Sequence, residues 1–496
     1  MAGPMISSTA NGPVFEAKTT FYVIVCGLLA ATGGVTAMDD FLEKFFPAVY
    51  VRKHHVKENN YCKYNDKGLQ LFTSSLYLAA IVASFFASKC CTKFGRRPTM
   101  GVASMFFLAG VVFNAAAQNL AMLIIGRLLL GLGVGFANQT VPLFLSEIAP
   151  PQIRGMLNIL FQLMITIGIL LAQILNYFMS SHHPWGWRLS LGGAGVPALI
   201  LCFGSLLIPE TPTSLIERGH LDQGKLVLQK IRGTDAVEAE LGELVAASEA
   251  AKEMESPFKG LKRRESFPPL VVTVLIQVFQ QFGGMNAIMF YAPVLFQTMG
   301  FKSDASLLSN LITGSVNCVA TFVSSVLVDR AGRRALLLQA SAQMFLCQVI
   351  MGSIMAVHLK DNNTLPEGMA MGVVVLICAF VAGFAWSWGP MGWLIPSEIF
   401  PIQTRNAGYF FGVSTNMICT FIIAQTYLSM LCSMRAGVFF FFASWIAVMG
   451  LFVAFLLPET KGVPIEEVKE RVWKKHWFWK RYMTQDDEHP DKEVQL

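Results

Sequence analysis

The chain has 496 residues, of which 54% are hydrophobic and only 14% are charged, and its formal net charge is +6 at pH 7. Soluble domains are about a quarter charged, so this composition excludes an ordinary soluble enzyme or binding module. Repeated apolar runs of about twenty residues, each long enough to cross roughly 30 Å of hydrocarbon as a helix, indicate an integral membrane protein.

Twelve apolar runs are predicted as membrane-spanning helices: 20–38, 70–88, 99–116, 120–142, 157–180, 188–208, 268–292, 306–328, 335–357, 370–394, 407–432 and 437–457. The polar segment 1–18 has no basic cluster, and the first run is not followed by a small-residue cleavage site. We therefore expect no cleaved signal peptide. The predicted fold class is all-α and integral membrane.

Basic residues gather in short loops that follow even-numbered helices: Lys89, Lys93, Arg96, Arg97, Arg154, the stretch 259–264, Arg330, Arg333 and Arg334. Such loops stay in the cytosol, so both termini are predicted to be cytosolic. The loop 39–67 mixes both signs of charge and is assigned outside by parity. These basic loops and the basic tail 469–481 explain the net charge of +6, so no nucleic-acid partner is expected. The tail is also rich in tryptophan, which is typical of a segment at a membrane surface.

Most of the ten cysteines fall inside predicted helices or on the cytosolic side, where they are expected to be packed or reduced thiols. Two differ, because Cys62 precedes the second helix and Cys432 ends the eleventh. Topology places both at the extracellular face, where a disulfide can persist. Asn362 begins a glycosylation sequon in an extracellular loop, although many sequons stay empty.

Three unusual strings recur in the same order along the chain. Phe94–Pro98 returns as Ala331–Ala335, Ser146–Arg154 as Ser397–Arg405, and Pro209–Pro212 as Pro458–Lys461. Two similar halves suit a transporter that exposes a central site to alternate sides. We divide the chain into a cytosolic N-terminus (1–19), a six-helix bundle (20–208) with an extracellular lid (39–68), cytosolic linker helices (209–267), a second bundle (268–457) and a cytosolic tail (458–496).

The repeated charges lie at cytosolic helix ends, where surface ion pairs and topology signals are the ordinary interpretation. Because Glu and Arg recur together in each half, we favour a gate that holds the two halves together on the cytosolic side. The predicted gate comprises Arg96, Arg97, Glu147, Arg154 and Glu210 of the first half and Arg333, Arg334, Glu398, Arg405 and Glu459 of the second.

Further strings complete the pattern: Gly95–Arg97, Gly126–Arg127, Pro209–Leu215, Gln280–Asn286, Asp329–Arg334, Gly389–Trp393 and Pro458–Gly462. Together they resemble the sugar porter branch of the major facilitator superfamily, and within it the plant and algal monosaccharide–proton symporters. The match covers nearly the whole chain from Asp39 onward. It implies twelve helices in two pseudo-symmetric six-helix bundles.

Amides inside membrane helices are costly without partners, and sugar hydroxyls match Asn and Gln because both groups donate and accept. For any single amide, helix–helix hydrogen bonding is the simpler interpretation, but their joint match favours sugar binding. The resemblance implies a sugar site formed by Gln162, Gln280, Gln281, Asn286, Asn317, Trp393 and Asn416. Trp393 would offer an aromatic face to the apolar side of the sugar.

The resemblance also concerns the segments around this site. Gly283–Gly284 and Gly389–Pro390 are expected to bend or break helices 7 and 10 beside it. Phe290–Pro293 is expected to act as an extracellular gate or simply to pack. Related symporters tie an extracellular lid helix to their second half, and Cys62 and Cys432 match the tied positions, so the resemblance supports this disulfide.

Helix 1 departs from the family. Members carry a buried Asp there, the expected proton carrier, paired with a helix-4 arginine that matches Arg127. Only Ala31–Thr36 of that pattern is present, and about a dozen residues, on the order of 18 Å of helix, are missing. Asp39 lies three turns too far outward to replace the lost Asp. A splice form or an error in the gene model explains such a gap most simply; a real gap is expected to abolish proton coupling.

The sequence predicts a plasma-membrane hexose–proton symporter working by alternating access, with a monosaccharide, protons and the lipid bilayer as partners. An uncoupled facilitator or inactive isoform, and a sugar sensor that does not transport, are the alternatives. No P-loop, metal-ligand constellation or nucleophile–base pair is found, so no enzyme activity, cofactor or metal is expected. Gly131–Gly135 resembles a nucleotide loop only superficially, because it lies inside helix 4, where close helix packing explains it.

Overall fold

The computed structural model describes residues 35–36, 38–55, 61–148, 154–253, 257–298, 303–358, 365–461, 463 and 468–483. Ten helices or joined helices among them are long and apolar enough to cross a membrane. An eleventh span is broken, with a bend of 41° between 264–282 and 285–291. These spans confirm the predicted segments from 70–88 onward, whereas the first, 20–38, lies almost entirely outside the described residues.

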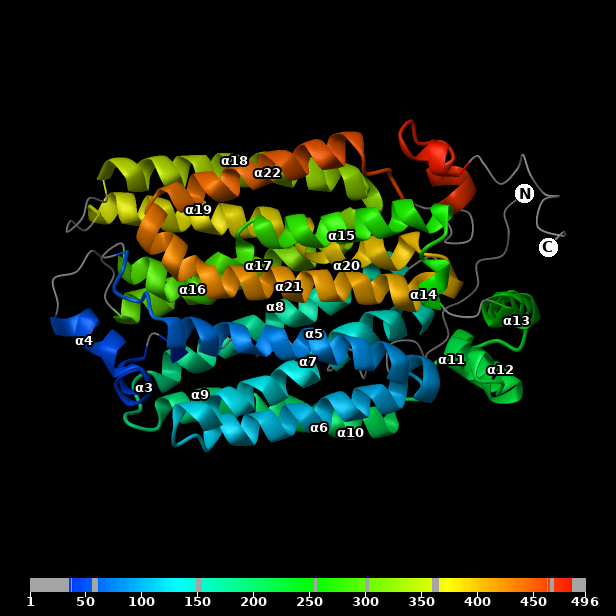
Figure 1. The fold of residues 1–496 in the computed structure, drawn as a ribbon, viewed down its shortest axis with the longest axis horizontal. Helices are drawn as coiled ribbons and strands as arrows, with labels where there is room; N and C mark the ends of the chain where they lie inside the picture. Colours follow the sequence, from blue (N-terminus) through cyan, green and yellow to red (C-terminus); the bar gives the residue numbers. More distant parts are fainter. Residues whose placement is uncertain are drawn as a thin grey trace.

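The spanning helices form two groups that lie side by side (Figure 1). The first comprises α5 (Lys67–Phe94), α6 (Arg96–Ala115), α7 (Leu120–Ile148), α8 (Arg154–Met179), α9 (Gly186–Gly192) and α10 (Gly195–Leu207). The second comprises α15 (Phe267–Phe282), α16 (Met285–Thr298), α17 (Ser303–Ala331), α18 (Arg333–His358), α19 (Glu367–Ala385), α20 (Trp388–Ile399), α21 (Ile402–Met434) and α22 (Gly437–Phe455). The groups meet mainly where α5 packs against α21 and α8 against α17.

Glycines let α7 approach its neighbours within the first group. A Cβ on Gly131 would lie 2.1 Å from the carbonyl oxygen of Leu76, and one on Gly135 would lie 2.4 Å from that of Ala80. Both distances are far below van der Waals contact, so any larger residue would force α5 and α7 apart. The prediction that the glycine run in this helix serves close packing is therefore confirmed.

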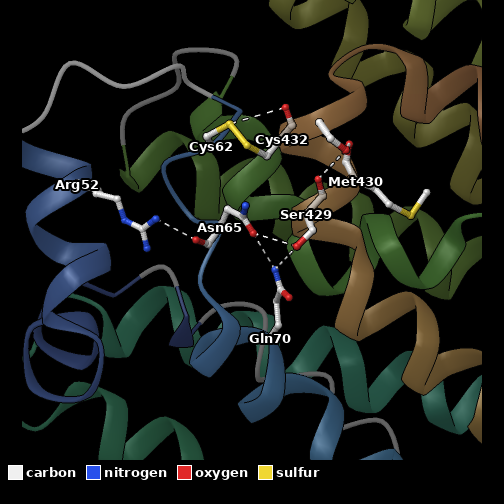
Figure 2. The surroundings of a disulfide bond; sticks show 8 residues. Arg52, Cys62, Asn65, Gln70, Ser429, Met430 and Cys432 are labelled. Atoms are coloured by element: carbon white, nitrogen blue, oxygen red, sulfur yellow. Dashed lines mark hydrogen bonds between the residues drawn. A yellow bond between two sulfur atoms is a disulfide. The ribbon is translucent and has the colours of Figure 1, made fainter.

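Short helices α3 (Asp39–Phe45) and α4 (Pro47–His55) lie at one end of the first group (Figure 1). The chain then leads to Cys62, which forms a disulfide with Cys432 at the end of α21 across a Cα–Cα distance of 4.6 Å (Figure 2). Beside it, Gln70 donates to Ser429 at 3.0 Å, so a second contact joins α5 to α21. The predicted disulfide is confirmed.

The opposite end carries the linker helices α11 (Pro212–Glu217), α12 (Leu221–Arg232), α13 (Glu238–Glu253) and α14 (Pro257–Gly260) (Figure 1). The first three share a small core of Ile216, Leu228, Val237 and Leu241. The segment 468–483, with a turn of π-helix at Lys469–Trp473 and one of 3-10 helix at Trp479–Tyr482, lies at the same end. The sequon at Asn362 lies outside the described residues.

Candidate functional site

A cluster of buried amides joins α15, α20 and α21 in the middle of the second group. Gln280 lies at its centre: its Nε2 donates to the carbonyl oxygens of Trp388 at 2.9 Å and Gly389 at 3.0 Å. Its Oε1 accepts from Nδ2 of Asn416 at 2.8 Å and from Nε2 of Gln281 at 3.3 Å. The predicted residues Gln280, Gln281 and Asn416 are thus brought together in one network.

Gln277, one turn before Gln280, belongs to the same network but was not predicted. Its Oε1 accepts from Asn416 at 2.7 Å and its Nε2 donates to the carbonyl oxygen of Gly392 at 2.7 Å. A Cβ on Gly392 would lie 2.3 Å from Nε2 of Gln280, so only glycine admits these amides against α20. The sequence offered one signal for Gln277: it precedes Gln280 by three residues, and residues with this spacing share one face of a helix.

The other predicted sugar residues surround this network. Asn286 on α16 donates through Nδ2 to Oε1 of Gln281, which extends the network past the helix break. Gln162 on α8 approaches α20, since its Nε2 lies 3.4 Å from the place of a Cβ on Gly389. Asn317 is buried on α17, which packs against α8 and α20, but among the described residues no hydrogen bond joins its side chain to the cluster.

Trp393 on α20 lies beside Phe161 of α8, with ring centroids 5.7 Å apart, and beside Tyr409 of α21 at 6.5 Å. It is buried at 7% exposure, and it brings an aromatic surface to the junction of the two helix groups. Amides that donate and accept, together with one aromatic face, are the chemistry that recognises a neutral polyhydroxyl ligand.

Two spans are interrupted beside the cluster. The break between α15 and α16 falls at Gly283–Gly284, as predicted, and Gly284 has a φ of +88° that favours glycine. The second break lies at Trp386–Ser387, one turn before the predicted Gly389–Pro390. Pro390 lies in the first turn of α20, where a missing N–H costs no helical hydrogen bond, so proline starts the second helix instead of breaking it.

Aromatic residues close to the α16 kink lie on the lid side of the amides. Tyr291, with non-helical φ and ψ of −119° and 15°, donates from its hydroxyl to the carbonyl oxygen of Ala424 at 2.9 Å. Its ring stacks on Tyr427 at 5.4 Å, and Phe290 lies 5.7 Å from Tyr77 of α5. The predicted gate residues thus contact both helix groups, and their gating role stays a prediction.

Arg127 is a buried cation in α7, 2% exposed, whose guanidinium lies 4.2 Å from the centre of the Phe72 ring. Among the residues that the structure describes, its Nε and Nη2 have no hydrogen-bond partner. Asp39 pairs with Lys53 at 2.7 Å and Asp40 with His183 at 2.5 Å, so these two carboxylates of the lid are engaged elsewhere.

A charge network lies at the linker end of the first group. Arg96, only 1% exposed, pairs with Glu147 at 2.6 Å and with Glu217 of α11 at 2.9 Å. Glu210 accepts the backbone N–H groups of Arg96 at 2.9 Å and Arg97 at 3.2 Å, so it caps the start of α6. Glu217 was not predicted.

The second group repeats this arrangement. Arg333 pairs with Glu398 at 3.0 Å, and Glu459 accepts the backbone N–H groups of Arg333 at 3.1 Å and Arg334 at 3.0 Å. The guanidinium of Arg334 bonds to the carbonyl oxygen of Ala454, as that of Arg97 bonds to Leu206. These pairs join helices within one half, as expected from grouping Glu147 with Arg96 and Glu398 with Arg333. Their role in holding the two halves together on the cytosolic side stays a prediction. Arg405 lies at the start of α21, and the side chain of Arg154 lies outside the described residues.

Among the described residues, ten single or joined helices, one strongly bent span, a repeated charge motif and a central amide cluster define a multi-pass membrane transporter with the major facilitator fold. The profile of the family described as "Sugar (and other) transporter" matches residues 29–472. The chain belongs to this family, whose members are transporters and not enzymes.

The similar proteins agree in fold and in length. "Sugar transport protein 6" of Arabidopsis thaliana is 60% identical over 98% of both chains, and "Sugar transport protein MST4" of Oryza sativa subsp. japonica is 58% identical over 99% of this chain and 97% of its own. The proton:xylose symporter XylE, solved with 6-bromo-6-deoxy-D-glucose, superposes with a TM-score of 0.79 at 24% identity, covering 92% of this chain and 99% of that one.

Proposed function

We propose that the chain is a monosaccharide transporter of the proton-symporter type that works by alternating access. The observation that carries the proposal is the amide cluster of Gln277, Gln280, Gln281 and Asn416, buried between α15, α20 and α21. Buried amides in a membrane are costly, and here they lie at two helix breaks beside Trp393. Relatives at 60% and 58% identity are named sugar transport proteins, which supports a sugar as the ligand.

The cluster gives this proposal a mechanism. In the described state the amides satisfy one another, so a sugar hydroxyl enters by replacing an amide–amide bond with a bond to itself. That exchange is nearly neutral in free energy, because each hydrogen bond contributes only about 0.5–1.5 kcal/mol net. Sugar binding therefore replaces hydrogen bonds that connect α15 to α20 and α21. As a result, the presence of sugar in the site changes how these three helices pack against one another.

The two charge networks supply the proposed gate. Because each arginine is held within its own half, each network keeps the ends of its helices together while the halves move as rigid bodies. With this mechanism we propose that the protein lies in the plasma membrane, that its termini and linker are cytosolic, and that its lid is extracellular and tied to α21 by the disulfide. Gln162, Asn286 and Asn317 are proposed as further sugar contacts.

An uncoupled facilitator is the second candidate, because the sequence lacks the helix-1 Asp of the family pattern. A buried arginine beside a titrating carboxylate suits proton coupling, but no carboxylate contacts Arg127 among the described residues. The sequence has no Asp where the family pattern places one.

Glucose uptake separates these candidates. The unaltered chain, and a version whose helix 1 is extended by about a dozen residues that include an Asp, are expressed in cells without hexose uptake. Labelled glucose is followed with and without an uncoupler. Uncoupler-sensitive accumulation by the unaltered chain supports the symporter, equilibration that the uncoupler does not change supports the facilitator, and saturable binding without flux refutes both in favour of a sugar sensor.

A further inference from the structure

The segment 468–483, called the tail segment below, is not explained by sugar transport. One face of it is buried: Val468, Val472, Trp473, Trp479 and Met483 all join a hydrophobic core that also contains residues of α15 and α22. The other face is strongly basic, because six basic side chains and one acidic side chain fall between Lys469 and Arg481.

Two tryptophans hold the tail segment against the end of a membrane-spanning helix. The indole Nε1 of Trp477 donates to the carbonyl oxygen of Phe455 at 3.0 Å, and that of Trp479 donates to Leu456 at 2.8 Å. Phe455 is the last residue of α22, so these bonds satisfy carbonyl groups that the helix leaves open. They also place the tail segment where α22 leaves the hydrocarbon.

A second set of contacts joins the tail segment to the start of α15. Lys469 pairs with Glu265 at 2.5 Å, and Arg264 donates to the carbonyl oxygen of Arg481 at 3.0 Å. Tyr482 stacks on Phe267, the first residue of α15, with ring centroids 5.2 Å apart. The tail segment is thus fixed against the ends of two spanning helices.

Large aromatic side chains remain exposed at this level. Trp477 is 63% exposed, Phe455 59% and Phe267 44%. Such residues in a soluble surface would be a liability, but at the boundary between hydrocarbon and headgroups they match the aromatic belt of membrane proteins. Lys475, Lys480 and Arg481 are exposed on the same short segment, so basic groups and interfacial aromatics occur together.

We propose that the tail segment binds the headgroups of anionic phospholipids, with Lys475, Lys480 and Arg481 contacting phosphate or carboxylate groups while Trp477 lies at the hydrocarbon boundary. Charge complementarity carries the choice of partner, because basic segments next to a membrane span attract anionic lipid. The attachment to Phe455 favours a lipid over an acidic protein, because it places the basic face at headgroup level. The proposed orientation makes this the cytosolic leaflet.

The test measures lipid affinity on the full chain. Delipidated protein in neutral detergent is titrated with dioctanoyl phosphatidylserine, and bound lipid is counted by native mass spectrometry. The double variant Lys475→Gln/Lys480→Gln is compared with Lys225→Gln/Lys230→Gln on α12, which removes the same charge away from the spanning helices. Each basic side chain at an anionic surface contributes about fivefold in affinity, so the tail variant is expected to bind at least tenfold more weakly.

A second measurement localises the effect. Hydrogen exchange of the backbone amides of 468–483 is followed in nanodiscs of phosphatidylcholine with and without phosphatidylserine, and slower exchange with phosphatidylserine is expected. Equal lipid affinity of the tail variant and the α12 control overturns the proposal, and so does unchanged exchange in this segment. Binding of glycerophosphoserine as tight as that of the lipid, or protection by an acidic peptide alone, would assign the site to a soluble anion or to a protein.

Discussion

Replacing Gln280 by alanine tests the amide cluster most sharply. The substitution removes four hydrogen bonds: two to carbonyl groups of α20, one from Asn416 and one from Gln281. Asn416 keeps its bond to Gln277, so the donor that loses most is Gln281. In the variant, sugar hydroxyls that would have bonded to Gln280 stay buried without a partner, at a cost of at least about 1 kcal/mol each, so two of them cost on the order of 2 kcal/mol, or roughly 30-fold in sugar affinity.

The assay is the concentration dependence of labelled-glucose uptake, in which we expect KM to rise at least tenfold for Gln280→Ala. Gln339→Ala is the matched control, because this glutamine on α18 is exposed and bonds to Gln343 and Trp386 outside the cluster. Surface expression and Tm in detergent separate a binding defect from misfolding. A KM within twofold of the wild-type value, at normal expression and Tm, would refute the assignment of Gln280 to sugar binding.

Three further substitutions test the structure around the site. Gly284→Ala should lower the free energy of unfolding by about 1–3 kcal/mol, because φ at this residue is +88° and the new Cβ would lie 2.8 Å from the Phe442 ring. The control Gly283→Ala should cost much less, because the atom nearest to its new Cβ lies at 3.4 Å. Equal Tm values for the two variants would contradict this expectation. The double variant Cys62→Ser/Cys432→Ser should lower Tm, since such a link stabilises by about 2–4 kcal/mol, and dithiothreitol should have no further effect on it; a Tm equal to that of the oxidised wild type would argue against the link. Glu147→Gln leaves Arg96 buried beside a neutral partner, so we expect the free energy of unfolding to fall by up to about 3–5 kcal/mol. The assay is the yield of folded protein in size-exclusion chromatography, which should be low. A normal yield would show that the pairing of Arg96 with Glu217 is sufficient without Glu147.

Hydropathy was enough to predict the spans, because in hydrocarbon every long apolar run must form a helix whose backbone satisfies itself. The break at Gly283–Gly284 was also predicted, since two adjacent glycines inside a span have few other uses. The position of the second break was not, because Pro390 suits either the end of one helix or the first turn of the next. Only packing against Gln280 and Gln162 decides between these two structures.

Residues that act through packing were harder to predict. Gln277 shares a helix face with Gln280, but that spacing alone does not distinguish an amide of the cluster from one that bonds only to a neighbouring helix. Glu217 had a better signal, because the repeat that relates Pro209 to Pro458 places Glu466 at the equivalent position of the second half. Such an internal repeat gives two copies of each gate position, so it identifies charges that one copy alone leaves ambiguous.

Glucose uptake by the unaltered chain tests the central claim of monosaccharide transport most directly. Cells that lack hexose uptake express the chain or Gln280→Ala, and labelled glucose is followed over time and concentration. The account predicts saturable uptake by the unaltered chain and a much higher KM for the variant. Saturable glucose binding without flux, or uptake that the variant leaves unchanged, would contradict it.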